Sequence, residues 1–213
     1  MKFAVSYSCG KDSTFALHKM MEQGHEPVCL VVMVNEKAGR SYFHGADCQM
    51  LKRYEKALGL PMILCLTAGE DYHLAFEEGL RKARFLGAEA ACFGDIDIEE
   101  NRKWEEDRCE AVGLTPCFPL WQTGREENVR ELLAKGYRCL IKSIKQRLLP
   151  RELLGTFMDE NAIACMAQAG IDICGEKGEY HTLVTGGPVF QESLMFRTGE
   201  ILDSGEYAVI EVS

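Results

Sequence analysis

Helical segments and short apolar runs alternate along the first half of the chain, and every helical segment is followed by a glycine. The helical periodicity predicts helices over residues 13–23, 47–58, 71–86 and 99–112. The apolar runs predict strands over residues 3–7, 28–34, 62–66, 90–94 and 115–118. Continuous apolar runs suit strands that are buried on both faces. The alternation therefore predicts an α/β fold, with a parallel five-stranded sheet sandwiched by helices.

The second half of the chain changes character near residues 121–124. The pattern there predicts a helix, a strand, a helix and two short antiparallel strands, at residues 126–134, 137–144, 159–169, 194–197 and 207–212. Glycines become frequent beyond residue 171 and indicate many turns. We therefore expect two domains: residues 1–122 with the parallel sheet, and residues 123–213 as a smaller C-terminal α+β domain.

A polar hexapeptide joins the first predicted strand to the first predicted helix: Ser8-Cys9-Gly10-Lys11-Asp12-Ser13. The N–H groups of a helix's first turn lack internal partners, and the helix dipole favours an anion beside them. Gly10 permits close backbone approach, the serine hydroxyls add donors, and Lys11 adds positive charge. Asp12 fits if it caps the helix or helps to hold a metal ion on the phosphates. The junction predicts a phosphate site, with an ordinary capped helix start as the alternative.

A second polar cluster lies far along the chain: Gly175-Glu176-Lys177-Gly178-Glu179-Tyr180-His181-Thr182. Two carboxylates three residues apart are costly to bury without a ligand. In a loop they are suited to binding a metal ion, positioning ammonia or holding a cationic group. A solvated glycine-rich turn fits the same composition.

Two smaller clusters follow predicted strands. Gly94-Asp95 ends the fourth strand, where open α/β sheets form their ligand crevice. Arg102, on the next helix, is suited to a phosphate or carboxylate, or to pairing with a glutamate of its own helix. Tyr42 and His44 lie in an aromatic-rich loop after the second strand, and we interpret them as contacts to nucleotide or substrate.

Composition limits the class of protein. Hydrophobic residues make up 46% and charged residues 27%, which is typical of a soluble globular protein. The net charge of −9 argues against a nucleic-acid binder. The 10 cysteines form no C-x-x-C pair and sit mostly in apolar runs, so we expect free thiols in a reducing cytoplasm. We see no signal peptide and no apolar stretch of membrane-spanning length.

The hexapeptide is not a Walker A loop, because Val5 and Asp12 stand where that motif needs Gly and Ser or Thr. It resembles the Ser-Gly-Gly-x-Asp-Ser loop of the PP-loop ATP pyrophosphatases, with Cys9 where that family usually has its first Gly. Those enzymes cleave ATP between the α and β phosphates. The resemblance implies an adenine nucleotide alpha-hydrolase-like fold.

All four clusters together resemble the diphthine–ammonia ligase branch of this superfamily, over nearly the whole chain. The resemblance implies ATP and Mg²⁺ as cofactors, with Asp12 at the metal. It implies catalytic roles for Lys11, Asp12, Glu176 and Glu179. It implies cofactor contacts at Ser8, Cys9, Gly10, Lys11, Asp12, Ser13, Gly94 and Asp95. It implies substrate contacts at Tyr42, His44, Arg102, Gly175, Glu176, Gly178, Glu179, Tyr180 and Thr182.

The resemblance also implies a reaction. A carboxylate attacks the α-phosphate of ATP, pyrophosphate leaves, and ammonia displaces AMP to give an amide. The acceptor would be diphthine on elongation factor 2 if the host makes diphthamide, and otherwise a small molecule. No membrane or nucleic acid is expected as a partner, and a homo-oligomer is compatible with the sequence. Two alternatives stay open: another adenylating PP-loop enzyme that modifies tRNA, and a non-catalytic sensor of ATP or AMP.

Overall fold

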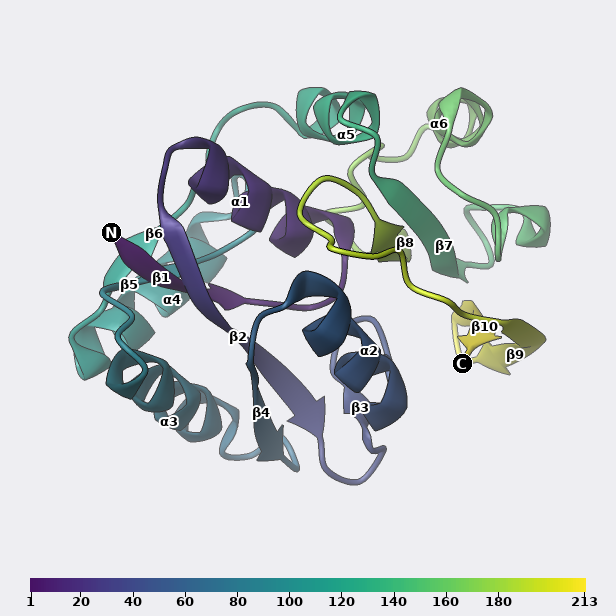
Figure 1. The fold of residues 1–213 in the computed structure, drawn as a ribbon. Helices are drawn as coiled ribbons and strands as arrows, with labels where there is room; N and C mark the ends of the chain where they lie inside the picture. The colour runs from purple at the N-terminus through teal and green to yellow at the C-terminus, as the bar shows by residue number, and fades with distance from the viewer.

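The computed structural model describes residues 1–213, and its larger sheet is the one expected from the alternation. Its strands are β1 (Lys2–Ser6), β2 (Glu26–Asn35), β3 (Arg40–Ser41), β4 (Met62–Thr67), β5 (Ala90–Cys92) and β6 (Thr115–Cys117). Five of them are parallel in the order β4-β2-β1-β5-β6, and β3 adds a short antiparallel pair to the end of β2. The parallel five-stranded sheet is confirmed (Figure 1).

The helices between these strands are α1 (Lys11–Glu22), α2 (Cys48–Leu58), α3 (Tyr72–Phe85) and α4 (Glu99–Val112). Gly59 and Gly113 form the C-caps of α2 and α4 in the left-handed conformation, at φ 65° and 71°. The carboxylate of Asp47 accepts a hydrogen bond from the Met50 N–H and caps the start of α2. The glycine pattern thus marked real helix ends.

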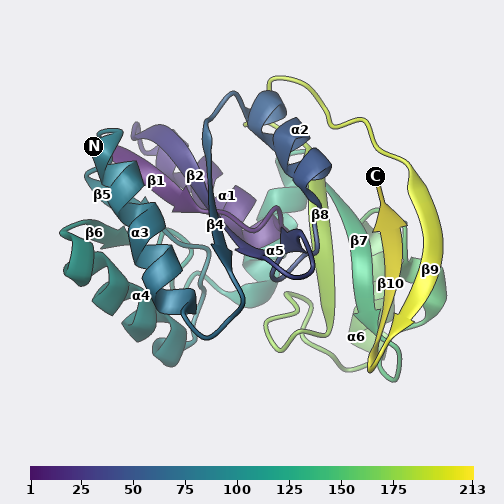
Figure 2. The same ribbon diagram turned by 90° about the horizontal axis from the view of Figure 1, so that it is seen from below.

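Both faces of the parallel sheet are buried, which explains its continuous apolar strands. On β2, Leu30 and Val32 face a core shared with α1 and α2, while Val31 and Met33 face α3 and α4. Successive side chains of a strand point to opposite faces, so every position along the strand must be apolar. Figure 2 shows the resulting layers, with α3 and α4 on one side of the sheet and α1 and α2 on the other.

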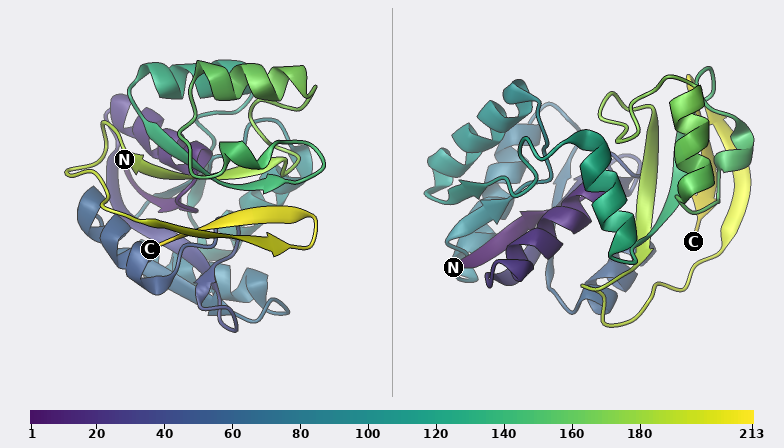
Figure 3. Two further views of the ribbon diagram at one scale, coloured as in Figure 1. Left: turned by 90° about the vertical axis from the view of Figure 1, so that its right-hand side faces the viewer. Right: turned by 90° about the horizontal axis from the view of Figure 1, so that it is seen from above.

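The second half of the chain forms an antiparallel sheet in the order β8-β7-β10-β9. Its elements are α5 (Arg125–Ala134), β7 (Arg138–Lys145), the 3₁₀ turn η1 (Arg151–Leu153), α6 (Glu160–Gln168), β8 (Tyr180–Gly186), β9 (Thr198–Ser204) and β10 (Tyr207–Val212). Helices α5 and α6 lie along one side of this sheet (Figure 3), joined by an ion pair between Arg130 and Glu160. No helix of the chain combines the length and the apolar content needed to cross a bilayer.

One predicted strand of the second half is wrong, and another strand was not predicted. Residues 194–197 are not in a strand, and the partner of β10 begins instead at Thr198. Every residue of β9 is exposed, so no apolar alternation marks it, and the turn at Gly205 sets its register with β10. Strand β8 begins inside the glycine-rich cluster, at Tyr180, where the composition suggested only turns.

The two sheets meet through the loop that follows β1. The Val184 N–H of β8 donates to the Cys9 carbonyl (2.9 Å). The Tyr54 hydroxyl of α2 donates to the carbonyls of Val184 (2.8 Å) and Cys9 (3.4 Å). Residues on both sides of the predicted boundary at 122/123 share one hydrophobic core. The division into two domains remains a prediction.

Substituting Tyr54→Phe removes the buried hydroxyl at this junction and leaves two carbonyls with one donor fewer. We expect the free energy of unfolding to fall by about 1–2 kcal/mol, as measured by urea denaturation. Tyr72→Phe is the matched control, because the Tyr72 hydroxyl has no hydrogen-bond partner in the protein. Equal effects of both substitutions would show that the Tyr54 hydroxyl bonds do not join the sheets.

Candidate active site

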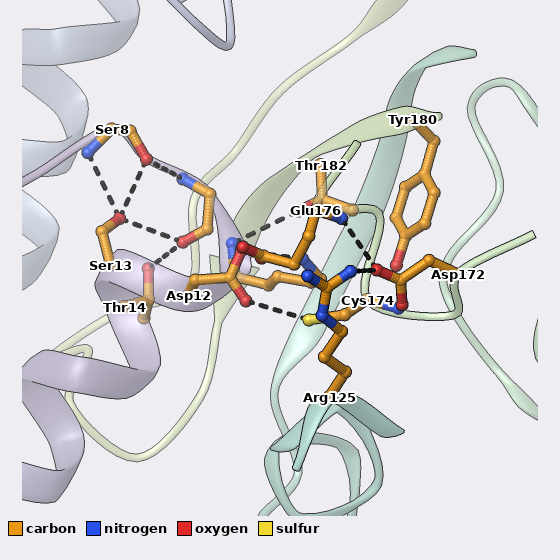
Figure 4. Close-up of polar contacts among 12 residues, drawn as sticks. Ser8, Asp12, Ser13, Thr14, Arg125, Asp172, Cys174, Glu176, Tyr180 and Thr182 are labelled. Carbon is orange, nitrogen blue, oxygen red and sulfur yellow. Dashed lines mark hydrogen bonds and ion pairs between the residues drawn. The ribbon is translucent and has the colours of Figure 1, made fainter. Parts of the chain in front are cut away.

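The loop between β1 and α1 is held by its own hydroxyl groups. The Ser8 N–H donates to Ser13 Oγ (3.2 Å), the Ser8 and Ser13 hydroxyls lie 3.1 Å apart, and the Gly10 N–H donates to Ser8 Oγ (3.4 Å). Figure 4 shows this network at the start of α1. The N–H groups of Asp12 and Ser13 donate to no acceptor in the protein. The helix start therefore presents free donors, as an anion site requires.

Cys9 occupies the most constrained backbone position of the loop. Its φ is 69°, in the left-handed region that favours glycine, and its side chain is fully buried. Glycine therefore suits this position because of its backbone freedom, and not only because of its small size. Burial raises the pKa of the Cys9 thiol, so Cys9 is an inert core residue whose carbonyl anchors β8.

Two glycines bring other segments against this loop. A Cβ at Gly94 would lie 2.8 Å from the Asp12 carbonyl carbon and from the Ser13 nitrogen. A Cβ at Gly10 would lie 2.4 Å from the ring of His44. The ends of β1 and β5 therefore converge at the point where the strand order reverses, which is where open α/β sheets bind ligands.

Lys11 and Asp12 form a charged pair at the start of α1. Lys11 Nζ lies 2.7 Å from Asp12 Oδ2, and the Lys11 side chain is nearly buried. Burial is the largest influence on the pKa of Lys11 and lowers it, but the charge of Asp12, the neighbouring Cys174 and Tyr180, and the hydrogen bond to Asp12 together raise it by more, so the amine stays protonated. Strand β8 completes the surroundings: the Lys11 N–H donates to Thr182 Oγ1 (3.3 Å), and the ammonium lies 5.6 Å from the centre of the Tyr180 ring.

The loop before β8 adds further metal-ligating groups. Ligand atoms of Asp12, Cys174 and Glu176 lie within 4.8 Å of one another, and the Cys174 thiol donates to Asp12 Oδ1 (3.7 Å). Burial, followed by the charge of Asp12, raises the pKa of Glu176 to about 7. Two carboxylates that repel each other beside free N–H donors fit Mg²⁺, which takes a few carboxylate oxygens together with phosphate oxygens. The Cys174 thiol is held neutral by burial and is a poor ligand for this ion.

Arg125 fixes the shape of that loop. It pairs with Asp97 (2.7 Å) and with Asp172, whose carboxylate also accepts the Cys174 N–H (2.9 Å) and the Glu176 N–H (3.4 Å), as Figure 4 shows in part. This chain of bonds ties the loop to the parallel sheet and aims Glu176 toward Asp12.

The two glutamates of the cluster have different surroundings. Glu176 lines the cavities beside Asp12, whereas Glu179 is buried and accepts the Lys177 N–H (3.0 Å). Gly175 and Gly178 adopt left-handed φ of 75° and 71° and let the loop turn back between them. The structure therefore brings Glu176 to the predicted site. The Glu179 side chain instead binds an N–H group of the loop backbone.

A cavity of about 530 Å³ opens above the loop and joins polar and aromatic walls. Its lining includes Ser8, Asp12, Ser13, Gly94 and Asp95, together with Glu176. Tyr72 and Phe76 of α3 and Trp104 of α4 add aromatic rings, and Glu70 and Glu105 add further carboxylates. Donors at the loop and aromatic rings in one cavity suit a nucleotide, whose phosphates need donors and whose base stacks on aromatic rings.

Of the predicted substrate residues, only Glu176 lines this cavity. The neighbouring hollow that contains Lys11 and Asp12 is lined by Glu176 and by five others: His44, Gly175, Gly178, Tyr180 and Thr182. Arg102 and Tyr42 line neither space and make other contacts. Arg102 pairs with Glu106 (2.8 Å), and its guanidinium lies 4.7 Å from the centre of the Trp121 ring. The Tyr42 hydroxyl donates to the Thr67 carbonyl (3.1 Å). His44 lines two neighbouring cavities, and burial lowers its pKa well below the usual range, so its imidazole is neutral.

Other residues of the site were not predicted. Cys174 stands two residues before Glu176, so the alternation Asp172-x-Cys174-x-Glu176 was a visible signal. Arg125 carried no such signal, because it meets Asp172 only through folding. Tyr72, Phe76 and Trp104 belong to helix faces whose orientation the sequence does not specify.

The parallel sheet, the loop after β1 and the cavity at the switch point define a PP-loop α/β protein. Residues 1–116 match the family model described as the diphthamide synthase N-terminal domain, and residues 125–211 match the diphthamide synthase C-terminal domain. The chain therefore belongs to the diphthamide synthase family.

Curated relatives resemble the chain over most of its length. Diphthine–ammonia ligase of Rattus norvegicus is 25% identical over 229 residues, covering 94% of this chain and 84% of the relative. The Homo sapiens protein of that name is 23% identical and covers 95% and 85%. The Schizosaccharomyces pombe protein is 24% identical over all of this chain but only 39% of its own length.

One solved structure also aligns with the chain. It is described as a predicted subunit of a tRNA methyltransferase from Methanocaldococcus jannaschii. The alignment covers 91% of this chain and 100% of the other, at 13% identity and a TM-score of 0.46.

Gly94→Ala tests the close approach of β5 to the loop. The new methyl group would meet backbone atoms, which cannot move aside as a flexible side chain can. We expect ATP affinity to fall by about tenfold or more, near 1.4 kcal/mol, in a calorimetric titration. Gly199→Ala, on the exposed strand β9, is the control and should bind ATP as the wild type does. Unchanged ATP affinity in Gly94→Ala would show that the nucleotide does not bind where β5 approaches the loop.

Glu105 lies on α4 and lines the cavity, and its ionisation should make the stability of the protein depend on pH. Burial, followed by the charge of Asp95, raises the pKa of Glu105 to about 11 from its ordinary 4.5. The folded state keeps a proton that the unfolded chain releases, so this group costs stability increasingly as pH rises above 4.5. Glu105→Gln removes that cost.

We therefore expect Glu105→Gln to be more stable than the wild type by about 1–3 kcal/mol at pH 8, with little difference at about pH 4. Urea denaturation across this range measures the effect. Glu110→Gln, exposed on the same helix, should change stability little at any pH. A Glu105→Gln curve parallel to the wild type would show that Glu105 is ionised in the folded protein.

Proposed function

We propose that this protein is an ATP-dependent amide ligase that adenylates a carboxylate and then amidates it with ammonia. One observation supports the proposal most directly: groups from both sheets meet at one place. The free N–H groups and Lys11 of the PP-loop lie beside Glu176, which arrives from a loop of the other sheet. The names of the curated relatives support a ligase of the diphthine–ammonia type.

In the first step, an oxygen of the acceptor carboxylate attacks the α-phosphorus of ATP, and the bond to the β-phosphate oxygen breaks. The products are an acyl-adenylate and pyrophosphate. The N–H groups of Asp12 and Ser13 and the ammonium of Lys11 stabilise the charge that grows on pyrophosphate. Their donors are already oriented, so little reorganisation is needed in the transition state.

Asp12 and Glu176 are the residues that would hold Mg²⁺. The ion, when bound, would neutralise phosphate charge and help to orient the leaving group. Lys11 already balances one oxygen of Asp12, which leaves Oδ1 facing Glu176 and Cys174.

In the second step, the nitrogen of ammonia attacks the acyl carbon, and the bond to the AMP oxygen breaks. The attacking nitrogen must lose one proton, and Glu176 lines the cavity with two carboxylate oxygens, so that one would face the ion while the other accepts this proton. Glu179 acts through the loop backbone, by holding the Lys177 N–H and thereby the position of Glu176. The acceptor is diphthine on elongation factor 2 where the host makes diphthamide, and a small acid elsewhere.

The decisive experiment is ATP–pyrophosphate exchange over a panel of carboxylic acids, followed by AMP and amide formation with and without ammonium. Exchange that requires an acid, and AMP release that requires ammonium, are the expected results. Exchange that requires tRNA would replace the proposal with a tRNA-modifying enzyme. Tight ATP binding without exchange under any condition would replace it with a nucleotide sensor.

Lys11→Met tests the first step directly. Removing the buried ammonium should lower the rate of exchange by about 10²–10³-fold, because pyrophosphate loses a fixed positive charge. Lys56→Met is the matched control, since Lys56 is exposed and pairs only with Glu192. An exchange rate within a factor of about two of the wild type in Lys11→Met would contradict the role assigned to Lys11.

A further inference from the structure

A second cavity, of about 440 Å³, lies behind the candidate site and between the sheets. It is walled by the segment from Arg40 to Gly45, by strands β7, β8 and β10, and by Ser204 at the end of β9. It shares Phe43, His44 and His181 with the hollow that contains Lys11, Asp12 and Glu176. The two imidazole rings pack edge to face, 5.1 Å between centres, at the boundary of the two spaces. A molecule that extends past these two rings would occupy both cavities.

Lys142 is the unusual residue of this cavity. It lies on β7 with only 2% of its surface exposed, and its Nζ donates to the Gly45 carbonyl (2.7 Å). An ammonium has three donors, and this bond uses one. Lys142 forms no ion pair, although the chain as a whole is strongly acidic. A buried cation without a counter-ion is costly, so a lysine here needs an anionic partner.

The other groups around Lys142 do not supply that anion. No aspartate or glutamate lines the cavity, and Arg40, the second cation, also forms no ion pair. Burial, followed by the charge of Arg40, lowers the pKa of Lys142 to about 8, against the weaker opposing effects of Asp47, Cys9 and Glu211. His44 and His181 are both shifted toward the neutral form and leave the positive charge to Lys142 and Arg40.

We propose that this cavity binds a second anionic group of the acceptor, so that, of the two acceptors named above, the substrate of this chain is the small acid, and that acid carries another carboxylate or a phosphate beside the reacting carboxylate. The inference rests on the proposed function for the identity of the reacting carboxylate. That carboxylate would lie near Lys11 and Glu176, while the second anion contacts Lys142 and Arg40 beyond His44 and His181. A cationic acceptor would meet like charges in the same place.

The test measures binding first, without ATP, so that it does not depend on catalysis. The probes are the dicarboxylates from malonate to adipate, the monocarboxylates of equal length, and inorganic phosphate, titrated by calorimetry. We expect the best dicarboxylate to bind about tenfold or more tightly than its monocarboxylate. Tight phosphate binding that competes with the dicarboxylate would indicate a phosphorylated acid, and weak phosphate binding a dicarboxylic acid.

Two variants remove the proposed contacts. Lys142→Met keeps the length of the side chain and removes its charge, and Arg40→Gln removes the charge of an exposed residue. Both should abolish the preference for the dianion, and both should raise the KM of an active acid far more than they lower kcat. Lys56→Met is the control for loss of one positive charge.

The outcomes separate this inference from the proposed function. Dianion binding that is lost in both variants, without exchange activity, would support the anion pocket while the ligase proposal fails. Exchange with monocarboxylates or cationic acids, at a KM unchanged in Arg40→Gln, would overturn the inference while the ligase proposal stands. If Lys142→Met is unstable, an unaltered dianion preference in Arg40→Gln overturns the inference by itself.

Discussion

The backbone hydrogen bond from Val184 to Cys9 joins the antiparallel sheet to the phosphate loop, and the geometry of the candidate site depends on it. It places Thr182 against the Lys11 N–H and Tyr180 beside the Lys11 ammonium. The carbonyl that accepts this bond belongs to Cys9, which adopts the left-handed conformation at φ 69°. The loop is therefore a shared part of both sheets, and its donors are positioned by both.

The electrostatics of the site are unbalanced in two places. Burial, followed by the charge of Asp12, raises the pKa of Glu176 to about 7. Lys142, on the far side of His44 and His181, is a buried cation without an ion pair. A cation at the first place and an anion at the second would remove both costs. Under the proposed function, this polarity would orient an acceptor with one carboxylate near Lys11 and Glu176 and a second anion near Lys142.

Much of the fold and part of the site followed from local patterns. Gly59 and Gly113 end helices because only a residue tolerant of positive φ closes those turns easily. The strand at 194–197 was wrong because it was inferred from apolar residues, whereas the real strand β9 is exposed and is held by pairing with β10. Glu176 and Glu179 look equivalent in the sequence, yet one lines the cavity and the other binds a loop N–H.

The sequence by itself determined the parallel sheet, the helices around it and the phosphate loop at the first strand–helix junction, because these depend on periodicity and on neighbouring residues. Only the tertiary structure decided which distant residues meet that loop. Arg125 reaches Asp172 and Lys142 reaches Gly45 across more than 40 and 90 residues of chain. Such contacts depend on how the two sheets pack against each other, and packing between distant segments leaves no periodic signal in the sequence.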